Sequence, residues 1–341
     1  MDAAQTTAVR PAPARREGSA PRTTRYGFHA SHEQFPPAEL LALLGAAEEA
    51  GFSSGMCSDH FAPWSPRQGH SGHAWAWLGS ALAATSLPLG VVTAPGQRYH
   101  PAVLAQAAAT LTQMHPGRLW VALGSGQALN EHITGTRWPG KEERIRRLEE
   151  CVEVMRALFA GETVSHDGLV RVDRARLWSL PERPPALLAA AVSPATAARA
   201  ARWADGLITV NQPGGAQRET LSAYREAGGR GPAVLQAHLS WAPDRESALE
   251  AAHDQWREAA LGGDVGWEIP LPEHFEQAAR FVEPHQVESS VHVSEDLARH
   301  TAWLADQADA GFDEIMLHQV GRDQAGFVEA FGARVLPELT R

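Results

Sequence analysis

The segment GMCSDHFAPW, residues 55–64, brings an acid, an imidazole and an indole close together: Asp59, His60 and Trp64. Imidazole titrates near neutral pH, so His60 is predicted to donate or accept a proton while a hydride is transferred. The flat indole of Trp64 suits stacking on a ring system or forming a pocket wall. Capping of a helix or bracing of a loop by Asp59 and His60 would explain the same spacing. The spacing alone leaves both interpretations open.

A second group of polar side chains follows an apolar run in ALGSGQALNEHITG, residues 122–135. Gly124 and Gly126 flank Ser125 and permit close approach of the backbone to a ligand. The amides of Gln127 and Asn130 can donate and accept hydrogen bonds. An ordinary tight turn would have the same composition, so the segment is a candidate binding turn.

A third candidate is SPAT, residues 193–196, at the start of a predicted helix. Pro194 suits the first helical position, and the free N–H groups of such an end can hold a phosphate. Ordinary capping by Ser193 explains the pattern equally well.

Composition restricts the class of partner. The chain has 341 residues, a net charge of -10 and two cysteines. Clustered Lys and Arg for binding phosphate backbones are missing, and no apolar run reaches the length of a membrane span, so neither nucleic acid nor a membrane is expected as a partner. The two cysteines give no disulfide framework, and the N-terminus lacks a secretory signal, so we expect a cytoplasmic protein. A small-molecule substrate is the expected partner.

Sixteen histidines suggest a metal hypothesis. The pairs His29/His32 and His70/His73 have the spacing of some metal sites, but no matching carboxylate cluster accompanies them. No metal is therefore predicted. Motifs for acyl or phosphoryl transfer are also missing.

The candidate residues depend on a regular alternation of apolar runs and helical patterns. Strands are predicted at 25–31, 53–59, 87–94, 118–126, 186–192, 205–210, 233–243 and 313–320, and helices at 36–52, 73–85, 101–115, about 142–159, 193–204, 217–228, 244–261 and 323–339. Eight such units predict an α/β fold, a closed TIM (β/α)8 barrel. An open doubly wound sheet is the main alternative, but no Gly-x-Gly-x-x-Gly turn follows the first strand.

The rest of the chain is assigned around this barrel. Residues 1–24 are predicted to be a disordered tail, and residues 25–341 the barrel, with insertions at about 161–184 and 261–293. Because the residues after the strands of such a barrel face the active site, the three candidate segments should meet there.

Several motifs together resemble the bacterial luciferase-like family of flavin and deazaflavin oxidoreductases. They are SDHFAPW, RYHPAVLAQAAATL, GRLWVALGSGQALNEHITG and AVSPATAARAARWADGLITV, and the likeness runs over about residues 25–339. The most similar branch contains glucose-6-phosphate dehydrogenases that use coenzyme F420, with sister sequences associated with FMN. The resemblance implies a luciferase-like barrel that lodges a flavin-type ring at its carboxyl face.

The resemblance also implies roles for individual residues. Asp59 would contact the cofactor, His60 would donate a proton or stabilise hydride transfer, and Trp64 would line the site. The remaining cofactor contacts would come from Ser125, Gly126, Asn130, Val91, Val92, Ala94, Val192, Ser193, Ala195 and Thr196. The family places a non-prolyl cis peptide near the end of the third strand, which would join Val91 to Val92.

The sequence departs from the family at the substrate contacts. Gln127 replaces an acidic residue proposed as proton acceptor, and an amide cannot act as a general base near neutral pH. Val192 and Ser193 replace a Gly-Gly pair near the cofactor phosphate. Val210 and Pro213 replace the Thr and Lys that hold substrate phosphate. A sugar phosphate substrate is therefore not expected.

The sequence predicts an oxidoreductase that transfers a hydride between FMN or coenzyme F420 and a small organic substrate, with His60, Trp64 and Gln127 as catalytic residues. Reduction is favoured over alcohol oxidation because Gln127 is not a base. The alternatives are an FMN-dependent monooxygenase that uses reduced flavin from a partner reductase, and a non-catalytic flavin-binding protein. A separate flavin or F420 reductase is a candidate partner. A homodimer is compatible with the family.

Overall fold

The computed structural model describes residues 24–262 and 264–340. Eight parallel strands form a closed barrel, as predicted: β1 (Arg25–Ala30), β2 (Ser54–Ser58), β3 (Leu89–Thr93), β4 (Leu119–Leu123), β7 (Ala186–Ala190), β8 (Gly206–Val210), β9 (Ala233–Trp241) and β11 (Glu314–Gln319). Strand β11 pairs with both β1 and β9, which closes the ring. The predicted tail lies outside the described residues, apart from Thr24.

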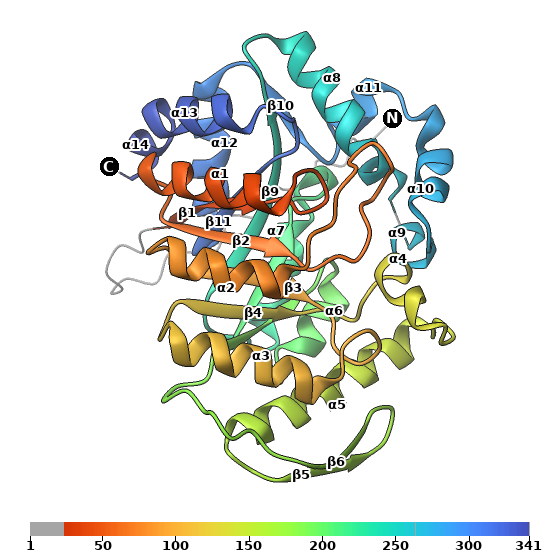
Figure 1. Cartoon of the computed structure of the whole chain (residues 1–341). Helices are drawn as coiled ribbons and strands as arrows, with labels where there is room; N and C mark the ends of the chain where they lie inside the picture. The colour runs from red at the N-terminus through yellow and green to blue at the C-terminus, as the bar shows by residue number, and fades with distance from the viewer. Residues whose placement is uncertain (1–23, 263, 341) are drawn as a thin grey trace, which may run out of the picture.

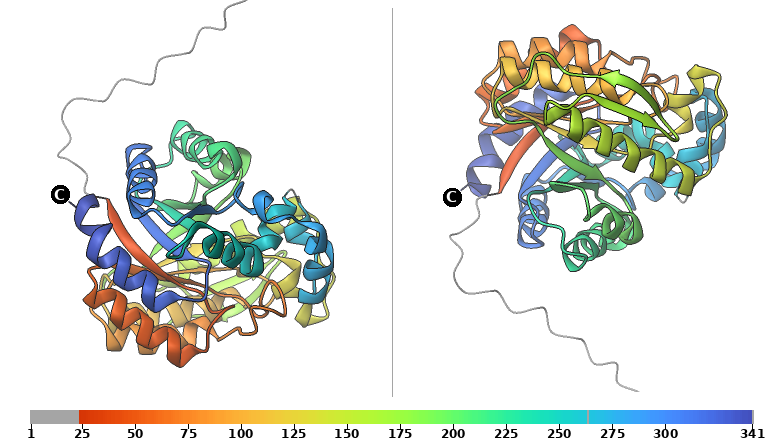
Figure 2. Two further views of the ribbon diagram at one scale, coloured as in Figure 1. Left: turned by 90° about the horizontal axis from the view of Figure 1, so that it is seen from above. Right: turned by 90° about the horizontal axis from the view of Figure 1, so that it is seen from below.

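Helices cover the outside of the barrel (Figures 1 and 2). They are α1 (Pro37–Glu49), α2 (Ala74–Ala84), α3 (Pro101–Met114), α5 (Lys141–Phe159), α6 (Pro194–Ala200), α7 (Gln217–Glu226), α8 (Arg245–Trp256), α12 (Leu297–Asp309), α13 (Gln324–Arg334) and α14 (Leu336–Leu339). Helix α12 occupies a segment for which the sequence analysis predicted no element. Its polar sequence, LARHTAWLADQAD, buries only a narrow face: His300, Leu304 and Gln307.

Apolar side chains fill the barrel interior at the amino ends of the strands. The inner core consists of Met56, Trp120, Ala122, Leu188, Ile208, Val234 and Met316. Gly90 is required beside Trp120, since a Cβ at this position would lie 2.0 Å from the indole ring. Because these side chains fill the amino end, the barrel cavity opens at the carboxyl end of the strands.

Two segments depart from the alternation of barrel strands and helices. An antiparallel hairpin, β5 (Val164–Asp167) and β6 (Arg171–Ala175), lies outside the barrel beside α5 (Figure 1). Between α8 and α12 the chain forms α9 (Val265–Glu268), α10 (Pro272–Ala278), α11 (Pro284–Val287) and the short strand β10 (His292–Ser294), which pairs with β9. Short helix α4 (Ala128–Glu131) follows β4, and 3-10 turns occur at His132–Thr134, Pro213–Gly215, Arg257–Leu261 and Ala279–Phe281.

The predicted cis peptide between Val91 and Val92 is wrong. No peptide bond in the described part of the chain is cis. Val91 and Val92 lie in a regular ladder, paired with Cys57 and Ser58 on one side and with Val121 and Ala122 on the other. An unbroken parallel register on both sides keeps this backbone extended and trans.

Across residues 24–262 and 264–340, no helix combines the length and apolar character needed to cross a membrane.

Candidate functional site

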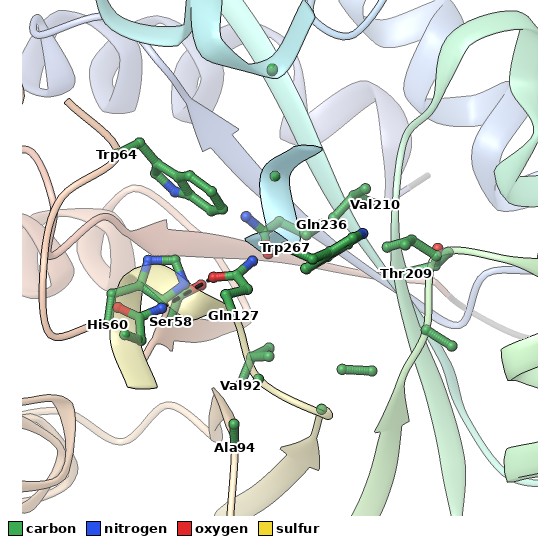
Figure 3. A pocket seen from close by; sticks show the side chains of 18 of the residues that line it. Ser58, His60, Trp64, Val92, Ala94, Gln127, Thr209, Val210, Gln236 and Trp267 are labelled. Carbon is green, nitrogen blue, oxygen red and sulfur yellow. Dashed lines mark hydrogen bonds between the residues drawn. The ribbon is translucent and has the colours of Figure 1, made fainter. Parts of the chain in front are cut away.

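A cavity of about 680 Å³ opens at the carboxyl ends of the barrel strands. Residues within or just after each barrel strand line it, together with Trp267 and Phe275 from the segment between α8 and β10. Figure 3 shows His60, Trp64 and Gln127 on one side of the cavity, and Thr209 and Val210 on the other. The carboxyl ends of the strands thus bring together side chains that are far apart in the sequence.

Most of the predicted site residues line this cavity. They are Asp59, His60, Trp64, Val92, Ala94, Ser125, Gly126, Gln127, Asn130, Val192, Ser193 and Thr196. Val91 and Ala195 do not. Val91 points to the opposite face of β3 and is fully buried between the strands and the outer helices. Ala195 lies in the first turn of α6 with its side chain exposed to solvent.

His60 is held by a buried carboxylate that the sequence analysis did not identify. Its Nδ1 lies 2.6 Å from Oε1 of Glu33, whose side chain is 2% exposed. Ser31 donates a hydrogen bond of 2.9 Å to the other oxygen of Glu33. Burial alone would raise the pKa of Glu33, but the charge of His60 and its hydrogen bond lower that pKa to about 2. Glu33 is therefore ionised at neutral pH and fixes the ring of His60 through Nδ1.

Trp64 forms a wall of the cavity next to His60. Its ring meets His60 edge to face at 5.3 Å and Phe275 of α10 at 5.4 Å. Its backbone N–H donates to Oε1 of Gln68 at 2.8 Å, which fixes the turn. The loop after β2 and helix α10 thus pack against each other through this indole.

The carboxylate of Asp59 is saturated by protein donors. Its oxygens accept hydrogen bonds from Trp75 Nε1 at 3.2 Å, Thr93 Oγ1 at 2.8 Å and Tyr99 Oη at 3.2 Å. The guanidinium of Arg98 donates to the backbone oxygen of Asp59 at 2.6 Å. Asp59 is 3% exposed, so its main effect is to hold the loops after β2 and β3 together beneath the cavity.

Asn130 clamps two of the candidate segments to each other. Its Oδ1 accepts a hydrogen bond of 2.8 Å from the N–H of Phe61, the residue after His60. Its Nδ2 donates to Oε1 of Gln127 at 3.1 Å. The side-chain amide of Asn130 therefore fixes the distance between the His60 loop and Gln127.

Small side chains leave a flat slot across the ends of β3, β4 and β7. Val92, Ala94, Gly124 and Ala190 line it. A Cβ at Gly124 would project into this space, 3.7 Å from that of Ala190. Gly126 has φ 86°, a left-handed conformation that favours glycine. Small side chains at these positions keep bulky groups out of this part of the cavity.

The predicted phosphate position at Ser193 is partly occupied by the protein. Helix α6 has only seven residues, and the Ser193 hydroxyl accepts from the N–H of Thr196 at 3.4 Å. Cationic side chains that line the cavity come instead from α5, namely Lys141 and Arg144. Arg144 is 3% exposed, stacks over Trp138 and forms a 2.9 Å ion pair with Glu268 of α9.

The wall formed by β1, β9 and β11 contains histidines. His29, His238 and His318 line it together with Gln236. The rings of His29 and His318 stack with centroids 4.0 Å apart, and Gln236 Nε2 lies 3.1 Å from His238 Nε2 and 3.2 Å from His318 Nδ1. Burial is the main cause that lowers the pKa of His29 to about 4 and of His238 to about 3, and it also lowers the pKa of His318 well below its ordinary value. We call these four residues the histidine wall, which is uncharged at neutral pH.

Sequence reasoning missed Glu33 and the histidine wall for different reasons. Glu33 follows the first strand, where a barrel places site residues, so its position was a usable signal. His29, Gln236, His238 and His318 lie inside strands whose apolar runs hide the alternation of inward and outward side chains. Trp267 lies in an irregular segment that offers no periodic signal.

The chain is similar to known proteins over most of its length. A family model for luciferase-like monooxygenases matches residues 18–318. An F420-dependent glucose-6-phosphate dehydrogenase of Nakamurella multipartita is 36% identical over 331 residues, which cover 94% of this chain and 97% of that protein.

Solved structures show the same likeness. An F420-dependent secondary alcohol dehydrogenase in complex with an F420-acetone adduct matches with a TM-score of 0.86 and 29% identity, covering 94% of this chain and 99% of that one. The F420-dependent tetrahydromethanopterin reductase of Methanopyrus kandleri matches with a TM-score of 0.74 and 19% identity, covering 93% and 99%. This last likeness shows a shared fold.

Proposed function

The chain belongs to the luciferase-like monooxygenase family, and from this premise we propose that it transfers a hydride between coenzyme F420 and a small uncharged organic substrate. The observation that carries the proposal is the Glu33–His60 pair beside a flat slot at the barrel mouth. The names of the relatives at 36% and 29% identity favour F420 over FMN.

The residues of the cavity fit a flavin-type cofactor. The slot between Val92, Gly124 and Ala190 has small side chains on the faces where a ring would lie. Lys141 and the buried Arg144 offer positive charge for an anionic tail. When bound, F420 supplies a planar deazaflavin whose ring carbon gives or takes a hydride.

His60 performs the proton transfer in this proposal. Because Glu33 binds Nδ1, Nε2 is left to exchange a proton with a substrate oxygen. Nε2 of a protonated imidazole can donate that proton to a carbonyl oxygen being reduced, while the ionised Glu33 keeps the ring in place through Nδ1. Trp64 packs against His60 and excludes water on that side.

The substrate is proposed to differ from that of the named glucose-6-phosphate dehydrogenases. Val210 and Pro213 line the cavity without offering a cation to a phosphate group. Gln127 stands near His60 but carries an amide, so it can orient a substrate oxygen but cannot take its proton. Both observations favour reduction of an uncharged carbonyl or activated double bond.

Titration of the purified protein with F420 and with FMN, followed by fluorescence, tests the cofactor assignment. We expect F420 to bind at least tenfold more tightly than FMN, a difference of about 1.4 kcal/mol. Anaerobic oxidation of reduced F420 in the presence of acetone then tests hydride transfer. Preference for FMN with oxygen uptake would favour the monooxygenase alternative, and failure to bind either cofactor would contradict the proposal.

A further inference from the structure

The histidine wall has no part in the proton transfer assigned to His60, yet it forms one side of the same cavity. Strand β11, which carries His318, lies four strands from β4 around the barrel, so the wall is opposite Gln127. A ligand held between β3 and β7 would therefore turn its free face toward these side chains.

Hydrogen bonding within the wall fixes the orientation of its groups. The Gln236 amide nitrogen lies within reach of His238 Nε2 and His318 Nδ1, so donation to both leaves each of these atoms unprotonated. The proton of neutral His318 is then on Nε2. This N–H has no hydrogen-bond partner among the described residues, although His318 is 1% exposed. A buried donor without an acceptor is costly, which points to a ligand atom.

The acceptor side of the wall comes from Gln236. With its nitrogen used by the two histidines, its Oε1 is free to accept, and Figure 3 shows the side chain reaching toward Trp267 at the centre of the cavity. An N–H donor and an amide oxygen together match a group that can both accept and donate. A hydroxyl group does both.

We propose that Gln236 and His318 form a subsite for an uncharged hydroxyl group on the substrate, next to the carbon that exchanges the hydride. The inference rests on the proposed function and names its substrate class: a neutral hydroxylated ketone or the corresponding diol. The histidine wall cannot balance the charge of a phosphate group on a substrate, because its residues carry no charge at neutral pH. The cationic residues of the cavity, Lys141 and Arg144, lie on helix α5, which follows β4.

The backbone around the subsite is fixed independently of any ligand. Asn211 Oδ1 accepts from the N–H of His238 at 2.7 Å, and its Nδ2 donates to the backbone oxygen of Ser290 at 2.9 Å. The ring of Trp256 packs against His318 at 4.6 Å. The donor and acceptor are thus preorganised, as selective binding requires.

The test compares reduction of acetone, hydroxyacetone, dihydroxyacetone and dihydroxyacetone phosphate by reduced F420, after F420 binding has been measured. We expect kcat/KM about tenfold higher for hydroxyacetone than for acetone, the effect of about one hydrogen bond to a neutral group. The phosphate ester should react at least tenfold more slowly than dihydroxyacetone, because its charge has no partner at the wall.

Variants separate the subsite from general packing. Gln236→Leu and His318→Phe should abolish the preference for hydroxyacetone over acetone, so that kcat/KM for the two ketones becomes equal within about threefold. The matched control is His292→Phe, since His292 is a neutral histidine stacked on Trp303 outside this cavity. His292→Phe should keep the preference for hydroxyacetone over acetone. If His318→Phe does not fold, Gln236→Leu alone provides the test.

Any one of three results would overturn the proposed subsite. The first is an equal kcat/KM for acetone and hydroxyacetone, and the second is no reduction of hydroxyacetone or dihydroxyacetone by the F420-bound enzyme. The third is a faster reaction of the phosphate ester than of dihydroxyacetone. Such results with F420 bound leave the proposed cofactor intact. Absence of F420 binding overturns the proposed function itself.

Discussion

The buried histidines on two walls of the cavity have different kinds of partner. On the β1–β2 side, His60 faces the ionised carboxylate of Glu33 at 2.6 Å. On the β9–β11 side, His238 and His318 face each other and Gln236, and the pKa of His238 falls to about 3, mainly through burial. A carboxylate partner makes a histidine suited to proton transfer, whereas burial among neutral groups makes it a hydrogen-bonding group. The residue type alone does not determine which role is taken.

Acid unfolding should separate the two walls most strongly. The folded pKa of His29 is about 4 and that of His238 about 3, below the ordinary value of 6.5, so the unfolded chain binds protons that the folded chain does not. Stability should therefore fall as pH drops from 6.5 toward 4, by up to about 1.4 kcal/mol per pH unit for each histidine. Urea denaturation at pH 7 and pH 5 measures this loss.

The Glu33–His60 wall should respond in a different pH range. Glu33 has a folded pKa of about 2, so its contribution is present above its ordinary pKa of 4.5 and is lost as pH falls toward 2. His29→Gln should flatten the stability curve between pH 6.5 and 5, and Glu33→Gln should change it mainly below 4.5. A curve that His29→Gln leaves unaltered would contradict the assigned neutrality of the histidine wall.

Substitution within the Glu33–His60 wall should affect catalysis more than substitution in the histidine wall. We expect His60→Ala to lower kcat about 1000-fold and Glu33→Gln about 100-fold, in the range of general acid catalysis. Fluorescence titration should show F420 binding nearly unchanged in both. Loss of kcat in Glu33→Gln should come with an altered pH–rate profile, because a structural role alone would leave that profile unmoved. If His318→Phe and His60→Ala lowered kcat by the same factor, the two walls would not differ in their role in catalysis.

The clamp at Asn130 should have the smallest effect. Asn130→Ala removes the hydrogen bonds to the N–H of Phe61 and to Gln127, so the His60 loop loses one anchor. We expect kcat to fall about tenfold, since small displacements of a catalytic group are costly, while Asn130→Asp retains the acceptor and part of the rate. A rate unchanged in Asn130→Ala would show that the network around Asp59 positions the loop by itself.

Much of the fold could be predicted because each parallel strand is buried on both faces and is followed by a helical pattern. Residues after the strands, such as His60, Gln127 and Ser193, were placed at the mouth by the same rule, and they line the cavity. Helix α12 was missed because its polar sequence buries so narrow a face. Val91 and Ala195 were assigned by resemblance, which does not give the direction of a side chain.

The order of the units, the closed barrel and the polar segments at its carboxyl end follow from the amino-acid sequence, because hydrophobic periodicity and chain direction are local properties. The pairing of Glu33 with His60, and the contacts among His29, His238 and His318 across β1, β9 and β11, became visible in the folded barrel alone. Those residues are separated by up to hundreds of positions, and their charge states depend on burial and on neighbours that only the closed ring brings together.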